Sequence, residues 1–418
     1  MKTSGKKAKP SMVVLILVVL FVLFMGYRAN QDDALKNTSS PPDEAIYAVR
    51  GPHPVGIRDL VIEGKTPLDI TMWYPALNEN LEEKIKYPYK IKFGAPLGNV
   101  SIASSKGQAI REAPFDISTH PYPLVILSPG FSIGASSYAW LAEHLTSYGF
   151  VVVSPEHHET LDPANELWRA AITRPQDILK VFVFLDEQAR PESPLEGLLD
   201  PDLVAVIGHS YGGYTSLAAA GARIDTDAFQ SQCESVSGTD EPGAWLCEQL
   251  TPHMADMATL AELDSIPDGL WPAWADPRVD AIVPMAGDAF FFGQAGLAEI
   301  GVPVMAIGGT NDSDSPYMWS THPTYEYSSS AKKVRVALEG AEHMIFTGPC
   351  EKTPRLLKFF TDEFCSDSSW DRNYAHSLVK HFTTAFLLSE LKQDAAASDA
   401  LEPASVKFSD VTYEAQGY

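Results

Sequence analysis

Short apolar runs alternate with amphipathic segments through most of the chain. Runs of about four to eight apolar residues, bounded by glycine or proline, are typical of strands buried on both faces. Segments with apolar spacings of three and four separate these runs, as at residues 138–149 and 175–189, and predict helices. The alternation predicts a mostly parallel central sheet covered by helices on both faces. The predicted strands are residues 123–130, 150–155, 203–210, 280–287, 302–309 and 332–340.

The pattern changes towards both ends of the chain and once in the middle. Residues 57–64 and 68–76 predict a strand hairpin, residues 78–120 are irregular, and residues 355–364 and 377–391 predict C-terminal helices. Residues 222–279 interrupt the alternation with two cysteines, three tryptophans and several prolines, which suggests an insertion that caps a cleft. The expected organisation is an N-terminal segment 1–27, a linker 28–50, a catalytic domain 51–393 that contains the cap 222–279, and a solvated tail 394–418.

The first 27 residues have the features of an export segment. Lysines precede residues 12–25, which contain no charged side chain. A membrane-spanning helix needs about 20 apolar residues, whereas the core of a signal peptide needs about 7–15. The length favours a cleaved signal peptide, but the lack of a small-residue cleavage motif favours an uncleaved anchor, which we expect here. In either case the rest of the chain is exported, either anchored and facing outside or secreted.

Charge and cysteine content narrow the possible partners. The formal net charge is -23 at pH 7, and an acidic surface repels phosphate backbones, so nucleic acid is excluded as an expected partner. No cysteine or histidine spacing matches a zinc site, so no metal is expected.

The four cysteines allow three pairings. Because they fall into two local pairs, we expect Cys233–Cys247 and Cys350–Cys365 disulfides in an exported chain.

The clearest candidate chemistry lies in residues 204–221, VAVIGHSYGGYTSLAAAG. The apolar run stops at Gly208, and a small-residue segment that predicts a helix follows. GHSYG fits G-x-S-x-G, in which the serine lies on a strained strand-to-helix turn that exposes its hydroxyl. The turn also places Ser210 at a helix N-terminus, where backbone amides favour negative charge. Ser210 is therefore the predicted nucleophile.

A serine hydroxyl is a weak nucleophile and needs a base. With this type of turn the chain order is serine, then acid, then histidine. His343 follows the last predicted strand, on a loop at the carboxyl end of the sheet, and is the predicted base. Other histidines fit worse because they precede the serine, follow a strand too soon or lie on a predicted helix: His157, His158, His322, His376 and His381.

The carboxylate that would orient the imidazole has more than one candidate. Asp312 and Asp314 follow strand 302–309, and Asp288 follows strand 280–287. Such a carboxylate holds the histidine tautomer and stabilises the imidazolium. Asp312 lies closest after its strand and is the expected acid, with Asp288 as the alternative.

The negative charge that develops on an attacked carbonyl oxygen needs backbone N–H donors. One predicted donor is Tyr211, the residue after the nucleophile. The other should come from the loop SPGFSIG after the strand 123–130, where Phe131 follows Gly130.

These segments resemble a known family. Residues 123–159, the GHSYGG turn, NDSDSP and GAEHMIF look like the platelet-activating-factor acetylhydrolase and dienelactone-hydrolase-like branch of the α/β-hydrolases. The opening VGIRDLVIEGKTPLDITMWYPA is also typical of that branch. More distantly, the chain is similar to bacterial cutinases and polyester hydrolases, whose acid lies in an N-D-S-x-x-P segment. The resemblance covers roughly residues 50–393.

The resemblance implies an α/β-hydrolase fold with a cap-like insertion and a serine carboxylic-ester hydrolase that needs no cofactor. Two departures stand out. Pro129-Gly130 stands where many relatives have His-Gly, and the acetylhydrolases proper take their acid from the segment that corresponds to Asp288. By matching motifs, the resemblance implies that Ser210 is the nucleophile, His343 the base and Asp312 the acid. The backbone amides of Phe131 and Tyr211 would form the oxyanion hole.

The substrate class implied by the resemblance is short-acyl or oxidised-acyl phospholipids and other small esters. A membrane-anchored enzyme would suit a lipid substrate. The alternative is a cutinase-like polyester hydrolase, against which the insertion argues because a cap would block a polymer. Two further hypotheses are a serine peptidase and a non-catalytic binding module. The presence of Ser, Asp and His in the expected order argues against the binding module. Aromatic residues flank the catalytic loops and could line an apolar acyl pocket: Phe131, Phe290, Phe291, Phe292, Tyr317 and Trp319.

Overall fold

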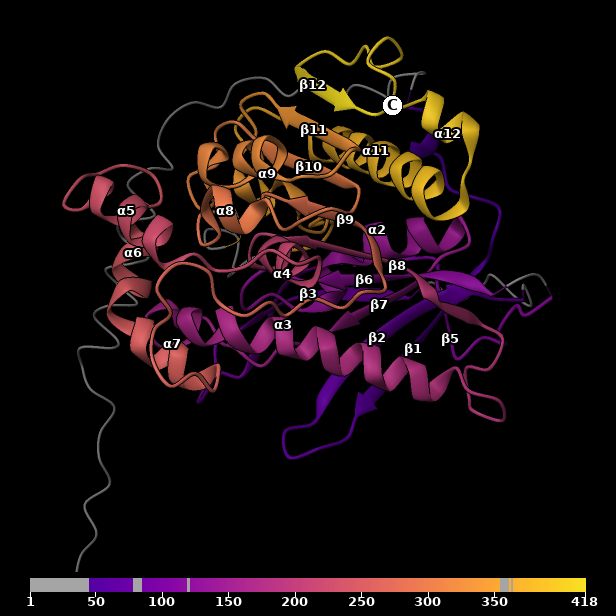
Figure 1. Cartoon of the computed structure of the whole chain (residues 1–418). Helices are drawn as coiled ribbons and strands as arrows, with labels where there is room; N and C mark the ends of the chain where they lie inside the picture. The colour runs from indigo at the N-terminus through magenta and orange to yellow at the C-terminus, as the bar shows by residue number, and fades with distance from the viewer. Residues whose placement is uncertain (1–44, 78–84, 119–120, 354–360, 362–363) are drawn as a thin grey trace, which may run out of the picture. The chain divides into compact units, whose positions relative to one another are not determined.

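In the computed structural model, the buried runs pair with one another in a ten-stranded sheet. The strand order is β12-β11-β10-β9-β8-β6-β7-β2-β1-β5, and the strands from β11 to β7 run parallel (Figure 1), which confirms the predicted mostly parallel sheet. The parallel strands are β6 (Tyr122–Ser128), β7 (Val151–Pro155), β8 (Leu199–His209), β9 (Val279–Met285), β10 (Val304–Gly309) and β11 (Lys333–Leu338). The structure describes residues 45–77, 85–118, 121–353, 361 and 364–418.

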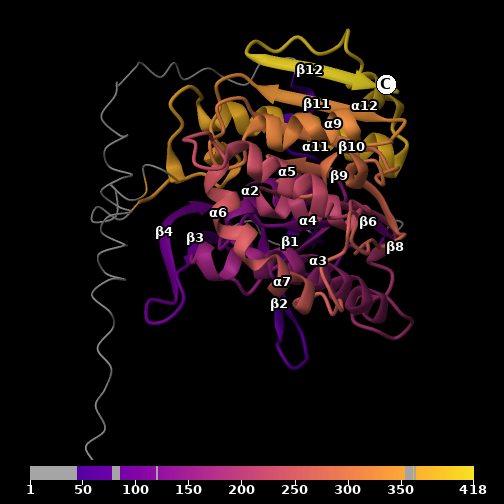
Figure 2. The ribbon, with the colours of Figure 1, turned by 60° about the vertical axis from the view of Figure 1, so that its left-hand side comes forward.

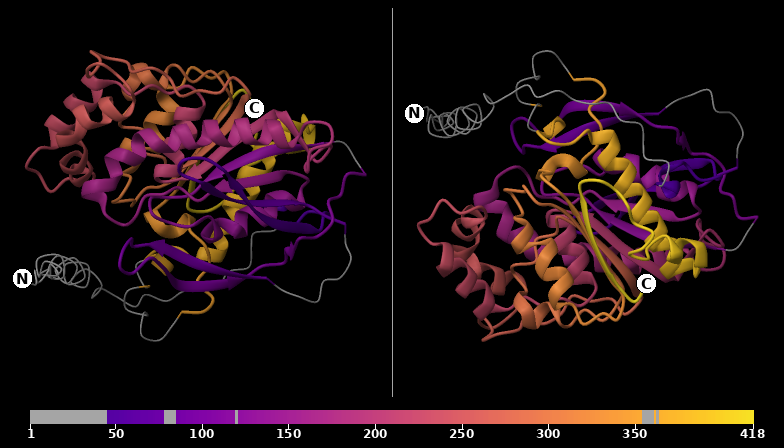
Figure 3. Two further views of the ribbon diagram at one scale, coloured as in Figure 1. Left: turned by 90° about the horizontal axis from the view of Figure 1, so that it is seen from below. Right: turned by 90° about the horizontal axis from the view of Figure 1, so that it is seen from above.

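Helices cover both faces of this sheet, as the alternation predicts. Alternate residues of β6 point into opposite cores: Leu124 and Ile126 pack in one hydrophobic cluster, and Val125 and Leu127 pack in another. Helices α3 and α4 supply the first cluster, and α2 and α11 supply the second; Figure 3 shows α3 from one side of the sheet and α11 from the other. The bounds are α2 (Ala139–Ser147), α3 (Pro163–Gln188), α4 (Tyr211–Ala219) and α11 (Arg372–Lys392).

Antiparallel strand pairs lie towards both edges of the sheet. The predicted hairpin is present as the antiparallel pair β1 (Val55–Ile62) and β2 (Leu68–Pro75), and the short strand β5 (Ile110–Arg111) pairs in parallel with β1. At the other edge β12 (Val411–Gln416) pairs with β11. The remaining elements that flank the carboxyl-side loops are η2 (Ala135–Tyr138), α8 (Gly293–Leu297), η4 (Tyr317–Trp319), α9 (Thr321–Tyr327) and η5 (His343–Phe346).

The expectation of a solvated tail at residues 394–418 is wrong. This segment forms α12 (Ala395–Asp399) and then strand β12. Ala397 and Leu401 are fully buried, and the Tyr413 ring stacks on Phe382 of α11. The small alanine side chains that look like low complexity in the sequence let α12 pack closely against α11.

The irregular reading of residues 78–120 also needs correction. The described residues of this stretch include a two-stranded antiparallel sheet of β3 (Lys86–Lys92) and β4 (Asn99–Lys106). Tyr87, Tyr89 and Ile91 alternate into the core, which is the period-two signal of a strand. The end of β3 matters for the site because the Lys92 N–H donates to the Ser132 carbonyl at 2.9 Å.

The insertion 222–279 consists of short helices joined by loops. Figures 1 and 2 show α5, α6 and α7 gathered in one group, and α6 and α7 contact α3. The expected disulfides Cys233–Cys247, between α5 and α6, and Cys350–Cys365 are both present. The role of the insertion as a cap, and the domain division as a whole, stay predictions. The bounds are α5 (Thr226–Val236), α6 (Ala244–Leu250), η3 (Thr251–His253) and α7 (Met254–Leu260).

The predicted anchor or signal peptide at residues 1–27, and most of the linker 28–50, lie outside the described residues. The described part of the linker begins with the single turn η1 (Ile46–Ala48). Among the residues that the structure describes, no helix has both the length and the apolar character needed to cross a membrane.

Candidate active site

Ser210 lies on a strained turn between β8 and α4. Its φ is 58° and its ψ is -125°, a conformation that costs a non-glycine residue about 1–3 kcal/mol and is held in place by the surrounding structure. A Cβ at Gly208 would collide with the Gly212 carbonyl, and a Cβ at Gly212 would collide with the Ser128 carbonyl. The two glycines are therefore required by the close approach of β6, β8 and α4, as the motif predicts.

The Ser210 side chain stays accessible although its neighbours are buried. Ser210 is partly exposed, whereas His209 and Tyr211 are buried, and the Ser210 N–H donates to the Met285 carbonyl of β9 at 2.9 Å. Within the described residues the Ser210 hydroxyl has no hydrogen-bond partner. Catalytic hydrogen bonds are often long without substrate and tighten when it binds, so the hydroxyl is free to be engaged.

The predicted base and the predicted acid meet. Nδ1 of His343, at the start of η5 after β11, lies 2.7 Å from Oδ2 of Asp312, which follows β10. The other oxygen of Asp312 accepts the N–H groups of Asp314 at 2.9 Å and Ser315 at 2.8 Å. Those two amides aim the carboxylate, which leaves Oδ2 for the imidazole. Because both side chains are buried, the pair is shielded from water.

The alternative acid lies nearby but is not hydrogen-bonded to the imidazole. Asp288 is buried and is close enough for its charge to act on His343, yet the His343 Nδ1 partner is Asp312. Burial raises the pKa of Asp288 to about 7, so this carboxyl is partly protonated at neutral pH. The geometry therefore favours Asp312 as the acid, while the catalytic role of each residue stays a prediction.

The electrostatics of the pair affect when His343 can act as a base. Burial lowers the pKa of His343, but the charge of Asp312 and its hydrogen bond outweigh burial and raise the pKa to about 9. The imidazolium that forms when the histidine accepts a proton is stabilised by the same interaction. The neutral form that starts the reaction is correspondingly rarer at lower pH.

We therefore expect kcat/KM for an uncharged ester to rise about tenfold per pH unit on the acid side and to level off near pH 9, since only neutral His343 accepts the serine proton. The measurement is a pH–rate profile at constant ionic strength, with enzyme stability checked at each pH. A profile that levels off near the ordinary histidine value of about 6.5 would show that Asp312 does not raise the pKa in solution.

Two backbone amides are left unpaired beside this pair. Neither the Phe131 N–H, on the loop after β6, nor the Tyr211 N–H, at the first position of α4, donates to a partner within the described residues. The backbone of this loop lies against the start of α4, since a Cβ at Gly212 would come within 2.6 Å of the Pro129 carbonyl, and the Phe131 and Tyr211 rings lie 6.0 Å apart. Two free donors close together at a helix N-terminus suit an oxyanion.

His209, the first variable residue of the GHSYG motif, has a role that the sequence analysis missed. Its Nδ1 lies 2.8 Å from the Tyr138 hydroxyl, and its Nε2 lies 3.1 Å from the His343 carbonyl. Burial holds the pKa of His209 well below its usual value, so the neutral ring accepts from Tyr138 and donates to His343. Since the Tyr138 hydroxyl also accepts the Gly130 N–H at 3.1 Å, the ring connects the base loop to the loop after β6.

The histidines that the sequence rejected as bases do not contact the Asp312–His343 pair. His157 is buried against Asp177, and His376 is buried against the Ile345 and Thr347 carbonyls. His322 contacts Arg335, and His158 is exposed. Among the described residues, no group of three or more histidine, cysteine or acidic side chains has the arrangement of a metal site.

The predicted aromatic lining is partly wrong. Phe291 and Phe292 are fully buried in the core, where Phe291 stacks on Phe229 and Phe292 stacks on Tyr214. The loop after β9 turns these two rings inward because α4 and α5 offer aromatic partners there. The remaining candidates contact one another or lie partly exposed near the catalytic loops: Phe131, Phe290, Tyr317 and Trp319.

Comparison with known proteins relates this geometry to one group of enzymes. The PET hydrolase-like family (PETase) matches residues 92–234, which include β6, the loop after it and the Ser210 turn. The bis(hydroxyethyl) terephthalate hydrolase of Streptomyces coelicolor is 30% identical over 154 residues, 37% of this chain and 46% of that protein.

Cutinases show a similar degree of likeness. Cutinase est1 of Thermobifida alba is 28% identical over 161 residues, 37% of this chain and 51% of that protein. Cutinase cut1 of Thermobifida fusca is 27% identical over 166 residues, 38% of this chain and 49% of that protein. The chain spans about half the length of the curated relatives it matches. With its mostly parallel sheet and the glycine-flanked serine turn, the chain belongs to the α/β-hydrolase superfamily.

Proposed function

We propose that this protein is a serine hydrolase of carboxylic esters. The observation that carries the proposal is the buried hydrogen bond between Asp312 and His343, which lies at the same edge of the sheet as the strained turn of Ser210. Histidine oriented by a carboxylate is the arrangement that activates a serine hydroxyl. The two unpaired amides of Phe131 and Tyr211 add the electrostatic part of the same chemistry.

In the proposed mechanism, the Ser210 oxygen attacks the acyl carbonyl while Nε2 of His343 takes the hydroxyl proton. The Asp312 carboxylate holds the proton of Nδ1 and stabilises the imidazolium. The two amides donate to the oxyanion of the tetrahedral intermediate. The alcohol leaves with the proton from His343, and a water molecule activated by the same imidazole then hydrolyses the acyl-enzyme and releases the carboxylic acid.

For the substrate, we propose small soluble esters related to polyesters, in preference to the phospholipids that the acetylhydrolase resemblance implies. The matched relatives are by name cutinases and a bis(hydroxyethyl) terephthalate hydrolase, which supports the cutinase-like reading. The insertion should limit the size of the substrate, because it packs against the segment that follows Asp312. A Cβ at Gly243, just before α6, would come within 3.0 Å of Trp319 in η4. An insertion packed against the acid loop favours a short diester over a long polymer.

We also propose that the protein acts outside the cytoplasm. Two disulfides occur in the described part of the chain, and disulfides persist mainly in oxidising compartments. The lysines followed by an uncharged apolar stretch at residues 2–25 support export, with the same two possibilities of anchor or cleaved signal.

The test is covalent labelling combined with a substrate panel. A fluorophosphonate should label the full-length protein once, on the peptide that carries Ser210, because the probe traps an activated serine whose oxyanion the amides stabilise. Turnover should be highest on bis(hydroxyethyl) terephthalate and p-nitrophenyl butyrate, and lower on a short sn-2-acyl phospholipid and on peptide p-nitroanilides. Highest activity on the phospholipid would support the acetylhydrolase reading instead. A protein that neither reacts with the probe nor hydrolyses any ester would contradict the proposal and favour a binding module.

A further inference from the structure

The loop after β6 is held from beneath by one buried guanidinium. Nη1 of Arg174, on α3, donates to the Pro129 carbonyl at 2.7 Å, and Nη2 donates to the Gly130 carbonyl at 3.0 Å. Arg174 is 0% exposed. Both carbonyls on the N-terminal side of Phe131 are therefore directed towards Arg174, and the Phe131 N–H, on the opposite side of the planar trans peptide from the Gly130 carbonyl, points away from that guanidinium.

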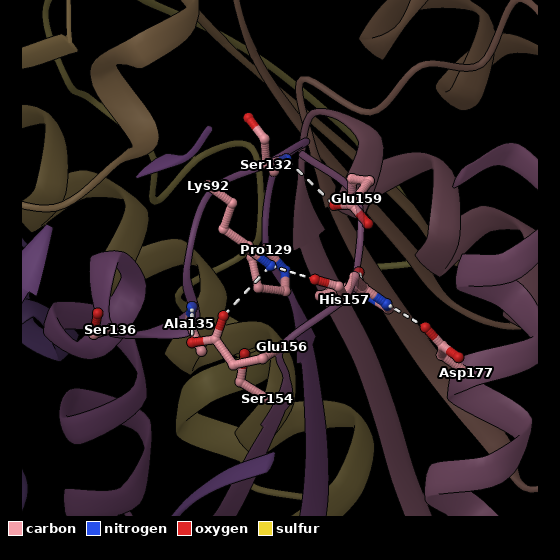
Figure 4. A network of polar contacts seen from close by, with 12 residues as sticks. Lys92, Pro129, Ser132, Ala135, Ser136, Ser154, Glu156, His157, Glu159 and Asp177 are labelled. Carbon is pink, nitrogen blue, oxygen red and sulfur yellow. Dashed lines mark hydrogen bonds and ion pairs between the residues drawn. The ribbon is translucent and has the colours of Figure 1, made fainter. Parts of the chain in front are cut away.

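A carboxylate holds the residue on the other side of Phe131. Glu159, on the segment after β7, is ion-paired with Arg174. Figure 4 shows its second contact, in which Oε1 of Glu159 accepts the Ser132 N–H at 3.2 Å. Burial alone would raise the pKa of Glu159, but the positive charges of Arg174 and Lys92 lower it, so the group is ionised. Ser132 has a φ of 57°, a left-handed conformation that this contact helps to hold.

The consequence is visible in the hydrogen bonds of the loop itself. The Gly130 N–H donates to the Tyr138 hydroxyl, the Ser132 N–H donates to Glu159, and the Ile133 N–H donates to the Gly130 carbonyl. Within the described residues, only the Phe131 N–H of this run lacks a partner. A loop whose neighbouring N–H donors are all paired, and whose Pro129 and Gly130 carbonyls are held by Arg174, presents a single unpaired N–H in a fixed orientation.

A second layer of charges fixes the segment that carries Glu159. Lys92 at the end of β3 forms an ion pair with Glu156 at 3.4 Å, and it also donates to the His157 carbonyl (Figure 4). Oε1 of Glu156 accepts the Ala135 N–H at 2.9 Å. His157 bridges Ser128 and Asp177, with Nε2 3.1 Å from the serine oxygen and Nδ1 2.9 Å from the carboxylate.

The three residues Ser128, His157 and Asp177 thus repeat the order of partners found in a catalytic triad. All three are buried, with exposed fractions of 0%, 1% and 3%, so no substrate reaches Ser128. Their position directly behind the loop that carries Phe131 makes them part of its support. Figure 4 shows the contact between His157 and Asp177.

We propose that Arg174 and Glu159 are positioning residues that preorganise the oxyanion hole by fixing the orientation of the Gly130–Phe131 peptide. Neither residue contacts substrate, since both are buried beneath the loop. Arg174 also lies under the second donor residue, with its guanidinium carbon 5.8 Å from the centre of the Tyr211 ring. This inference rests on the proposed ester hydrolysis.

Stability alone is a weak reason for such a pair. Removing two charges from water costs about as much as their attraction returns, and apolar replacements are often equally stable. A guanidinium, in contrast, offers several donors in a rigid planar fork, which can hold two carbonyls at once. The need to hold two adjacent carbonyls therefore explains an arginine at this position better than a contribution to stability does.

The experiment compares ester and thionoester substrates. In a thionoester, sulfur replaces the carbonyl oxygen and so takes the place where the oxyanion would form. Because sulfur accepts hydrogen bonds from the amides poorly, the ester-to-thionoester ratio of kcat/KM measures how much those two hydrogen bonds contribute to catalysis. Arg174→Lys keeps the charge but cannot hold both carbonyls. We expect it to lower kcat on p-nitrophenyl butyrate by on the order of 100-fold with little change in KM, and to lower the ratio by about tenfold.

Two further variants make the test specific. Glu159→Gln keeps the shape and should lower kcat and the ratio less, in the same direction. Arg278→Met is the matched control, because Arg278 pairs with Asp186 and Asp276 and packs over Phe182 just before β9, at the opposite end of the sheet from the site. It should change thermal stability but leave the ratio at the wild-type value.

The outcomes separate this inference from the proposed function. Arg174→Lys and Glu159→Gln proteins that fold, by circular dichroism and melting temperature, yet keep the wild-type ratio would overturn the positioning role and leave ester hydrolysis intact. A control that loses the ratio as well would show that general destabilisation causes the effect, which also overturns it. If the wild-type protein has no Ser210-dependent turnover, the proposed function fails first and the inference falls with it.

Discussion

Ser210→Ala is expected to abolish ester hydrolysis, with kcat lower by about 10⁴–10⁶-fold and the fold unchanged. The hydroxyl is the only nucleophile that the mechanism offers, and what remains would come from the oxyanion donors and binding. Alanine keeps the β-carbon that the turn already accommodates at a φ of 58°. The melting temperature should therefore stay close to that of the wild type, which is checked by thermal unfolding beside the kinetics.

The matched control for this substitution is Ser216→Ala on the same helix. Ser216 is fully buried, and its hydroxyl donates to the Gly213 carbonyl at 2.7 Å. Losing that hydrogen bond should cost stability of about 1 kcal/mol with little loss of kcat. Ser210→Ala protein that retains more than a few per cent of wild-type turnover, or that still takes up the fluorophosphonate, would mean that another group attacks the ester.

Much of the fold follows from local patterns in the sequence. The runs at residues 123–130 and 203–210 are apolar because β6 and β8 are buried on both faces, and that burial is what the pattern records. The strand β3 and the strand β12 escaped notice for a different reason. In β3 the alternation is short and contains Pro88, and β12 is polar on its exposed side, as expected of an edge strand.

Part of the candidate site can likewise be predicted from local sequence patterns, and part of it cannot. The turn at Ser210 and the loop of His343 are local signals, since each follows directly on a strand. The choice between Asp312 and Asp288 is not local, because both follow strands that end at the same edge of the sheet. It depends on whether the amides of Asp314 and Ser315 aim one carboxylate at the imidazole.

The support beneath the oxyanion loop is harder still to read from the sequence. Arg174 and Glu159 are 15 residues apart, on a helix and on the loop that precedes it, and a charged pair in that setting reads as a solvated surface. Only the packing of α3 against the loop after β6 shows that both side chains are buried. Charged residues that tertiary structure buries are the group that periodicity arguments miss.

Asp312→Asn should be the second most damaging change, with kcat/KM lower by about 10⁴-fold. Asparagine is nearly isosteric, but its amide can donate to Nδ1 and so favours the wrong histidine tautomer. The carboxylate that raises the pKa of His343 to about 9 is also gone, and burial then lowers that pKa. The residual activity should therefore level off at a lower pH than in the wild type, which a pH–rate profile of the variant measures.

Asp288→Asn is the matched comparison, because it makes the same change in a buried carboxyl beside the same imidazole. Burial already raises the pKa of Asp288 to about 7, so much of its charge is absent at neutral pH, and the hydrogen bond to Nδ1 is left in place. We expect a loss of less than about tenfold, since a partly protonated carboxyl that is not hydrogen-bonded to the imidazole alters the imidazolium energy by roughly one pKa unit at most. If Asp288→Asn is instead the variant that loses four orders of magnitude and Asp312→Asn stays active, then the acid is Asp288, and the contact seen between Asp312 and His343 is not the one that catalysis uses.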